Sequence, residues 1–302
     1  MEIMRKPYIA CMLLTLLLCR SIAAQEAGRI LREQNRVLYC HAGDLSFGRR
    51  VMDELRAALP VMMQRMGIQF IPDSIRIIVT GSEKEFQTWT CGQIPDWGMA
   101  AADPLRRMMF LNSSGLSSYP GSLGSVVRHE LSHLLFGMIL KGRPVARWFD
   151  EGMAMFLADE MRPGDRFRLS KAILTGQMLS LEEMEQVLTF RREKAALAYA
   201  QARTAVDYLI ETYGEPAFRL ILIRLHQGHD LESAFQYSLH VNLAEFEQGW
   251  KEAMQHRYGW LVLADYRLLF AVSLTILFIL AFWATRRRTR RIIHLWEQEE
   301  IS

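Results

Sequence analysis

The sequence predicts an α+β fold: a small mixed sheet with helices leads into a zinc-binding helix, followed by a mainly helical C-terminal half and one transmembrane helix. Short strand-like segments before residue 112, of which residues 74–80 are rich in Ile and Val, predict the sheet. Apolar residues that recur at helical spacing from residue 123 to residue 258 predict the helical half. Residues 268–285 carry no charge and would form about 27 Å of helix, close to the thickness of a bilayer core.

The N-terminal part of the chain alternates expected strands with expected helices. The first long helix places its large apolar residues on one side, and Ser46 can cap it. The last two strands form an expected antiparallel pair joined by Asp103-Pro104, and either of them could be the edge of the sheet. The expected strands are 37–41, 74–80, 98–102 and 107–111, and the expected helices are 46–66 and 83–89.

The second part of the chain is expected to be helical. Gly142 and Pro144 interrupt the first two helices, which can therefore fold back as an antiparallel pair. Ser180 and Glu183 have the spacing of a capping box at the start of a later helix. The expected helices are 123–140, 151–161, 181–188, 193–213, 215–226, 230–239 and 243–258.

Residues 129–133 read His-Glu-Leu-Ser-His, the H-E-x-x-H pattern of zinc-dependent hydrolases. Four residues turn a helix by about 400°, so His129 and His133 lie on one face and can hold one tetrahedral zinc ion. Glu130 is rotated by about 100° from His129, too far to be a ligand but close enough to reach a zinc-bound water. The alternative is a buried helix whose histidines are hydrogen-bonded to backbone groups.

A catalytic zinc ion normally has three protein ligands and one open position. Downstream, Asp150 and Glu151 stand at the start of the next expected helix, where acidic residues also suit the helix dipole. If the two helices fold back on each other, Glu151 faces the first one. On chemistry alone, Asp150 is the rival third ligand.

This part of the chain resembles the gluzincin zinc metallopeptidases, most closely the peptidase MA-like group. In that group the H-E-x-x-H helix is followed by a W-x-x-E-G-x-A segment. The matching residues of this chain are Trp148, Glu151, Gly152 and Ala154. The resemblance covers roughly residues 37–255, and it implies that His129, His133 and Glu151 bind the metal.

The resemblance implies a metallopeptidase that holds one Zn²⁺ ion per chain and hydrolyses a peptide or protein substrate. Glu130 would be the general base toward the zinc-activated water. Tyr199 loosely matches a Tyr of gluzincin aminopeptidases that donates a hydrogen bond to the developing oxyanion. The alternative is an ordinary helix tyrosine whose ring is packed and whose hydroxyl is solvated. Asp159 and Glu160 are candidates to orient the histidines from outside.

Two other functions are open on the sequence alone. The chain could be a non-catalytic module that keeps the peptidase fold and binds a partner, or a scaffold at the membrane that uses its helices between 181 and 258 as a docking surface. The net charge of +3, much of it at the C-terminus, gives no case for a nucleic-acid partner.

Both ends of the chain carry expected membrane signals. Residues 1–24 have the positive start, the short apolar run and the final small residues of a secretory signal peptide, with an uncleaved anchor as the alternative. Five arginines between residues 286 and 291 place the end of the apolar segment in the cytoplasm. We therefore expect a single-pass protein of the lipid bilayer, with an extracytoplasmic (periplasmic or extracellular) catalytic domain and a cytoplasmic C-terminus.

These signals divide the chain. We expect a signal peptide at 1–24, an N-terminal α/β part of the catalytic domain at 25–120, its zinc-helix and helical part at 121–260, a transmembrane helix at 261–285 and a basic cytoplasmic tail at 286–302. Cleavage of the signal leaves two cysteines, Cys40 and Cys91, and an oxidising compartment allows one disulfide between them.

Overall fold

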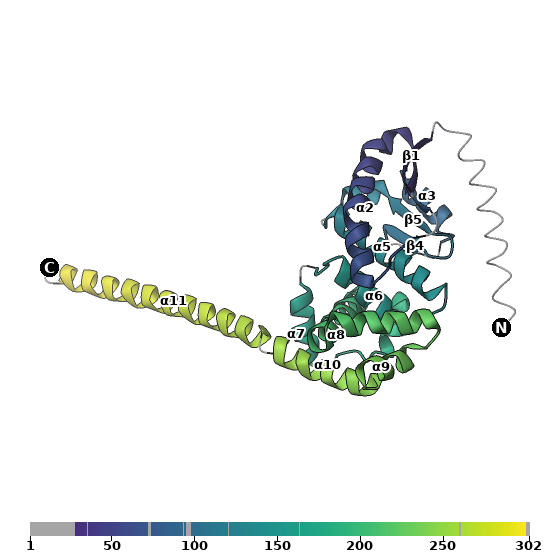
Figure 1. Cartoon of the computed structure of the whole chain (residues 1–302). Coiled ribbons are helices and arrows are strands. Elements are labelled where there is room, and N and C mark those ends of the chain that lie inside the picture. Colours follow the sequence, from purple (N-terminus) through teal and green to yellow (C-terminus); the bar gives the residue numbers. More distant parts are fainter. Residues whose placement is uncertain are drawn as a thin grey trace. The chain divides into compact units, whose positions relative to one another are not determined.

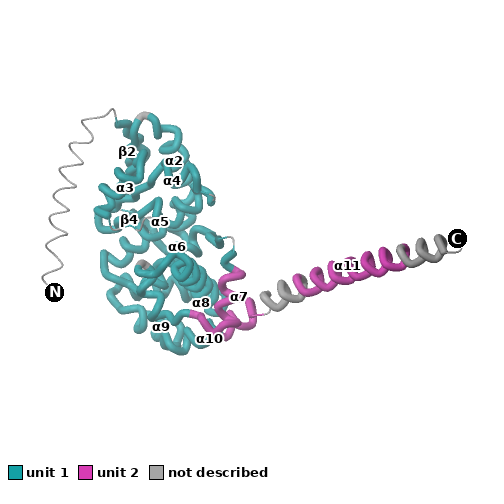
Figure 2. Tube along the Cα trace, turned by 180° about the vertical axis from the view of Figure 1, so that it is seen from behind, with its two compact units in different colours: residues 1–165, 179–251 teal, residues 166–178, 252–302 magenta. Residues whose placement is uncertain are grey.

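The computed structural model of this chain describes residues 28–299, except for residues 35, 72–73, 93, 95–97, 120, 163 and 260. The expected signal peptide, 1–24, therefore lies outside the described residues. The chain divides into two compact units: Met1–Asp165 with Leu179–Lys251, and Arg166–Met178 with Glu252–Ser302 (Figure 2).

The described strands of the larger unit form one five-stranded mixed sheet (Figure 1). The strands are β1 (Arg29–Glu33), β2 (Arg36–Cys40), β3 (Ile75–Thr80), β4 (Ala100–Asp103) and β5 (Met108–Asn112). Their order is β1-β2-β3-β5-β4, with the central pairs parallel and the two outer pairs antiparallel. The predicted small mixed sheet is confirmed. β1 was not predicted, because it is largely exposed and has no apolar run.

Burial accounts for the central strands and identifies the edge. β5 is buried along its whole length and β3 at every position except Arg76, as expected for strands covered on both faces. β4 forms the edge next to β5, and only Ala101 is buried in it. Of the two segments considered for the edge, 98–102 contains the edge strand. The choice of 107–111 is wrong, because β5 pairs with a strand on each side.

Most described helices belong to the larger unit. They are the 3₁₀ helices η1 (Ala42–Asp44) and η2 (Glu183–Thr189), and the α-helices α2 (Leu45–Met66), α3 (Glu83–Trp89), α4 (Ser113–Ser117), α5 (Leu123–Leu140), α6 (Arg147–Leu157), α8 (Arg192–Gln227), α9 (Leu231–Leu239) and most of α10 (Leu243–Tyr258). The bounds of α3, α5 and α10 are those predicted, and the α+β fold class is confirmed. The sequence analysis missed η1 and α4.

The start of α6 differs from the prediction. This helix begins at Arg147 rather than at Glu151. The backbone N–H of Arg147 donates to Glu185 Oε2 at 2.9 Å, so a distant carboxylate satisfies one of the free N–H groups that a helix start leaves. Glu151 consequently lies in the second turn of α6, with its side chain buried.

Other helix boundaries agree with the prediction only in part. The capping box of Ser180 and Glu183 is present, with reciprocal backbone-to-side-chain bonds of 2.8 and 3.1 Å, but the helix that follows is 3₁₀. α2 begins after Asp44, which makes no side-chain capping bond, so the expected cap at Ser46 is wrong. Gly214, at φ 84° and ψ 163°, interrupts α8 between the two helices that the sequence predicts.

Trp148 anchors α6 in an aromatic core. Its side chain is buried, and its ring centroid lies 5.5 Å from that of Phe149, 6.2 Å from Phe235 of α9 and 6.0 Å from Phe246 of α10. Aromatic pairs at these separations add to the stabilisation that comes from burial. The tryptophan of the W-x-x-E-G segment therefore positions α6 and does not line the site.

Cys40 is a free thiol buried at the end of β2. The disulfide between Cys40 and Cys91 that the sequence allows is therefore not formed in the structure. Burial raises the pKa of the Cys40 thiol, with a smaller effect of the same sign from Asp44.

The smaller unit contains most of α7 (Asp165–Leu174), the end of α10 and α11 (Leu261–Glu299). α7 was not predicted. Ser170 Oγ of α7 donates to the backbone oxygen of Tyr258 at 2.7 Å. Among the described residues, one segment, Leu269–Arg290 of α11, is long and apolar enough to cross a membrane, and its side chains are exposed.

Gly152 permits the close approach of α6 to α8. A Cβ at Gly152 would lie 2.3 Å from the backbone oxygen of Ala202. Gly152→Ala should therefore force the helices apart and lower the free energy of unfolding by about 1–3 kcal/mol. Thermal unfolding of the full chain measures this. Gly43→Ala is the control, because nothing lies within 4 Å of its added Cβ. Equal melting temperatures for both variants would contradict the prediction.

Candidate metal centre

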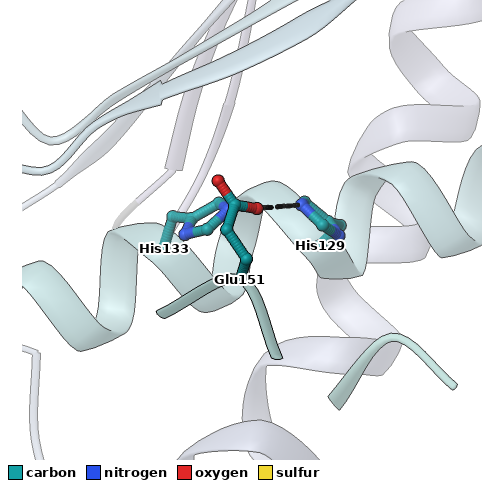
Figure 3. Close-up of side chains that lie close together, drawn as sticks. All are labelled: His129, His133 and Glu151. Carbon is teal, nitrogen blue, oxygen red and sulfur yellow. Dashed lines mark hydrogen bonds and ion pairs between the residues drawn. The ribbon is translucent and has the colours of Figure 1, made fainter. Parts of the chain in front are cut away.

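Two helices bring His129, His133 and Glu151 together (Figure 3). Both histidines project from α5, whose first turn is capped by Ser122: the Ser125 N–H donates to Ser122 Oγ at 3.0 Å. Glu151 comes from α6. One ligand atom from each residue lies within 4.8 Å of the others.

The distances between these atoms suit one small cation. The Nε2 atoms of His129 and His133 are 3.2 Å apart, and Glu151 Oε2 lies 3.6 Å from the first and 3.5 Å from the second. Ligands about 2.0–2.1 Å from a tetrahedral zinc ion are separated by about 3.3 Å. Two imidazoles and one carboxylate are also the donor set of catalytic zinc sites with an open position.

Each imidazole is held on its outer side by a carboxylate. His133 Nδ1 lies 2.8 Å from Asp150 Oδ1, and His129 Nδ1 lies 3.1 Å from Glu160 Oε2. A proton on each Nδ1 leaves the Nε2 lone pair directed at the position between the three ligands. Asp150, the rival ligand on chemistry alone, thus lies on the outer side of His133.

Glu160, and not Asp159, orients His129. Asp159 has a left-handed backbone conformation (φ 50°), and its side chain is 95% exposed. Glu160 Oε1 accepts from Arg162 Nε at 2.7 Å, while its other oxygen contacts His129. The carbonyl of Met155, near the end of α6, accepts from Arg203 Nη1 of α8 at 2.7 Å. The sequence analysis missed Arg162 and Arg203, because no local motif marks them.

The site without a metal is a cluster of paired charges. Burial lowers the pKa of His129, but hydrogen bonds with Glu151 and Glu160 outweigh it and raise this pKa to about 9. Burial also opposes protonation of His133, and the charges of Asp150 and Glu151 hold its pKa well above the ordinary value. Burial raises the pKa of Glu160, but its hydrogen bond with His129 brings it down to about 2. A divalent cation would replace the two imidazole protons, since only neutral imidazole is a ligand.

Glu130 lies beside the ligands without joining them. Its side chain is buried, and burial raises the pKa of its carboxyl above the ordinary value, although the nearby charges of His129 and His133 act in the opposite direction. A carboxyl with a raised pKa is better suited to accept and return a proton near neutral pH. Glu130 therefore lies on α5 within electrostatic reach of His129, His133 and Glu151.

Tyr199 projects from α8 into the same region and is buried. Burial raises the pKa of its hydroxyl, and the charge of Glu151 raises it further. The Arg162 guanidinium lies 5.3 Å from the centre of its ring. A neutral hydroxyl can donate a hydrogen bond, and the contact of the Tyr199 ring with Arg162 links this residue to the side chain that holds Glu160.

The match to a known family agrees with this geometry. The family model of the Peptidase MA superfamily matches residues 119–256, which include both histidines, Glu130, Glu151 and Tyr199. No curated protein matches the chain. Over residues 119–256 the chain is thus similar to the Peptidase MA superfamily, and the resemblance that the sequence indicates is confirmed there.

Loss of a ligand should remove the metal. We expect the full chain to contain one zinc ion, and His129→Ala, His133→Ala and Glu151→Ala each to lose it, because two ligands do not retain zinc against dilution. Elemental analysis of the purified protein measures this. Wild-type protein without stoichiometric metal, also after zinc is supplied during refolding, would contradict the assignment.

The outer carboxylates should have a smaller effect. Asp150→Ala and Glu160→Ala should weaken zinc binding by about 10–100-fold, because they orient ligands without touching the metal. Competition with a chromogenic chelator measures the affinity. Asp159→Ala is the matched control and should bind zinc as the wild type does. If Asp150→Ala lost more metal than Glu151→Ala, the third ligand would be Asp150.

Proposed function

We propose that this protein is a membrane-anchored zinc metallopeptidase that hydrolyses peptide bonds outside the cytoplasm. One observation carries the proposal: the side chains of His129, His133 and Glu151 meet at one point, and Glu130 follows His129 directly on α5. The match to the Peptidase MA superfamily supports a peptide or protein as the substrate.

The chain supplies groups for each part of the reaction. A bound zinc ion would lower the pKa of a water molecule and polarise the scissile carbonyl. Glu130 accepts the proton of the attacking water and returns it to the leaving amine. The Tyr199 hydroxyl donates to the oxygen on which negative charge develops. Asp150 and Glu160 hold the two imidazoles in the orientation that the ligands need.

The substrate backbone has a suitable partner in β4. This strand is the edge of the sheet, and its outer side pairs with no described strand. An extended peptide can add to such an edge through main-chain hydrogen bonds. β4 ends just before the turn that leads into β5, and α5 follows after α4.

Glu130→Gln separates an enzyme from a non-catalytic module. The amide preserves size but accepts no proton at neutral pH, so peptide hydrolysis by the full chain should fall at least about 10²-fold while zinc content stays normal. Chelator-sensitive cleavage by the wild type is the reference, and Glu182→Gln, at an exposed position, is the matched control. Equal rates for Glu130→Gln and wild type would assign the activity elsewhere. A zinc-loaded wild type that cleaves no peptide or protein would favour the binding module.

The membrane orientation has its own test. A signal peptide and a basic segment after the apolar helix predict that residues 25–260 lie outside the cytoplasm. Protease added from outside the cell, or to spheroplasts if the cell has an outer membrane, should therefore digest this region and spare the tail after residue 291. Digestion of the tail with protection of residues 25–260 would reverse the orientation.

A further inference from the structure

An apolar groove lies on the side of α5 opposite the two histidines. It has a volume of about 610 Å³ and is lined by the end of α2, the β4–β5 turn, α5 and α8. The lining residues Leu135, Met138 and Ile139 are rotated from His133 by about 140–240° around the helix axis. The groove is therefore separate from the candidate metal centre and has no part in the chemistry proposed for it.

One wall of the groove rests directly on α5. A Cβ at Gly137 would lie 2.1 Å from Cβ of Pro104, and a Cβ at Gly142 would lie 2.4 Å from Cδ2 of Leu105. The two glycines thus leave room for the β4–β5 turn to pack against the helix. A larger residue at Gly137 would have to displace Pro104 and with it this turn, whereas a larger residue at Gly142 would have to displace the exposed Leu105 side chain.

The opposite wall is tied to the end of α5 by hydrogen bonds. His226 Nδ1 of α8 donates to the backbone oxygen of Ile139 at 2.8 Å. Arg143 Nη2 donates to the backbone oxygen of His226, also at 2.8 Å. Both walls are therefore held by specific contacts, and the groove is formed before any ligand arrives.

The lining has the chemistry of a site for an alkyl chain. Of its 18 residues, four have polar side chains: Arg107, Lys141, His226 and Gln227. Ligand pockets of about 300–1,000 Å³ are mostly apolar with a few polar groups that orient the ligand. A peptide would bring N–H and C=O groups that need partners, whereas an alkyl chain brings none.

The charges and the rim indicate the rest of the ligand. Arg107 and Lys141 are cationic, and none of the described lining residues is acidic. Phe70 is 74% exposed, Leu105 is 77% exposed and Ile223 is 51% exposed, so apolar side chains continue from the groove to the surface. A ligand that satisfies both features has a long apolar chain and an anionic head group.

We propose that this groove binds an anionic amphiphile, with its alkyl chain along α5 between the β4–β5 turn and α8 and its head group at Arg107 and Lys141. Membranes are a source of such molecules. The candidate span begins at Leu269, and α10 ends at Tyr258, so a chain anchored through this span would be tethered to a bilayer by a short segment. The choice of a membrane source rests on the proposed anchoring, whereas the groove itself does not.

Photo-crosslinking tests the proposal with the full chain in discs of zwitterionic lipid. The probes are a photoreactive long-chain carboxylate and the uncharged alcohol of the same chain, with crosslinked peptides mapped by mass spectrometry. The carboxylate should label the groove about tenfold more than the alcohol. A second arm places the same reactive chain on an anionic phospholipid of the disc. Labelling in that arm identifies a membrane lipid, and labelling only by the free carboxylate identifies a soluble amphiphile.

Variants separate the groove from nonspecific labelling. Ile139→Trp should fill the groove and abolish labelling there, and Lys141→Glu should reduce it about tenfold. Lys84→Glu, an exposed lysine of α3, is the matched control and should change nothing. Zinc content reports folding independently of the groove and of catalysis. If Ile139→Trp fails to fold, Leu105→Glu places an acid at the exposed rim and should likewise abolish labelling.

Three results would overturn the proposal. The first is equal labelling by the carboxylate and the alcohol, the second is groove labelling that survives these substitutions, and the third is crosslinks found only outside the groove. The proposed peptidase is tested by Glu130→Gln and is unaffected by any of these results.

Discussion

The pairing of charges buried between α5 and α6 is the constraint on which the rest of the structure depends. The Nε2 atoms of His129 and His133 lie 3.2 Å apart and face the carboxylate of Glu151. Ionisable groups in such a place are stable only with partners at hydrogen-bond distance. Asp150 and Glu160 supply those partners on the outer sides. α5 and α6 must therefore keep the two histidines and the carboxylates that contact them in fixed relative positions, and the packing around the two helices maintains those positions.

α6 meets this requirement with consecutive residues that point in different directions. Trp148 packs into the aromatic core with α9 and α10, which sets the position of the helix. Asp150 and Glu151 meet α5, one on the outer side of His133 and one between the histidines. Gly152 admits the backbone of α8. The residues of the W-x-x-E-G-x-A pattern thus place one short helix against three neighbours: the aromatic core, α5 and α8.

Much of the fold follows from local features of the sequence. The bounds of α3, α5 and α10 agree with apolar periodicity, and the break at Gly214 agrees with the helix-breaking residue there. The errors occur where distant residues decide. α6 begins early because Glu185 satisfies its first N–H. β1 lacks an apolar run, because pairing with β2, and not burial of its own side chains, makes this segment a strand. Its sequence therefore gives no local signal for a strand.

By itself, the sequence determined that His129 and His133 share one helix face with Glu130 beside them, because a four-residue spacing has the same consequence in any helix. It also determined the apolar segment of α11, because composition and length suffice. Only the tertiary structure decided between Asp150 and Glu151 as the residue that faces both histidines, between Asp159 and Glu160 as the partner of His129, and between β4 and β5 as the edge strand. In each pair the two candidates are neighbours in the chain, so spacing does not distinguish them, and what decides is which distant element each one meets.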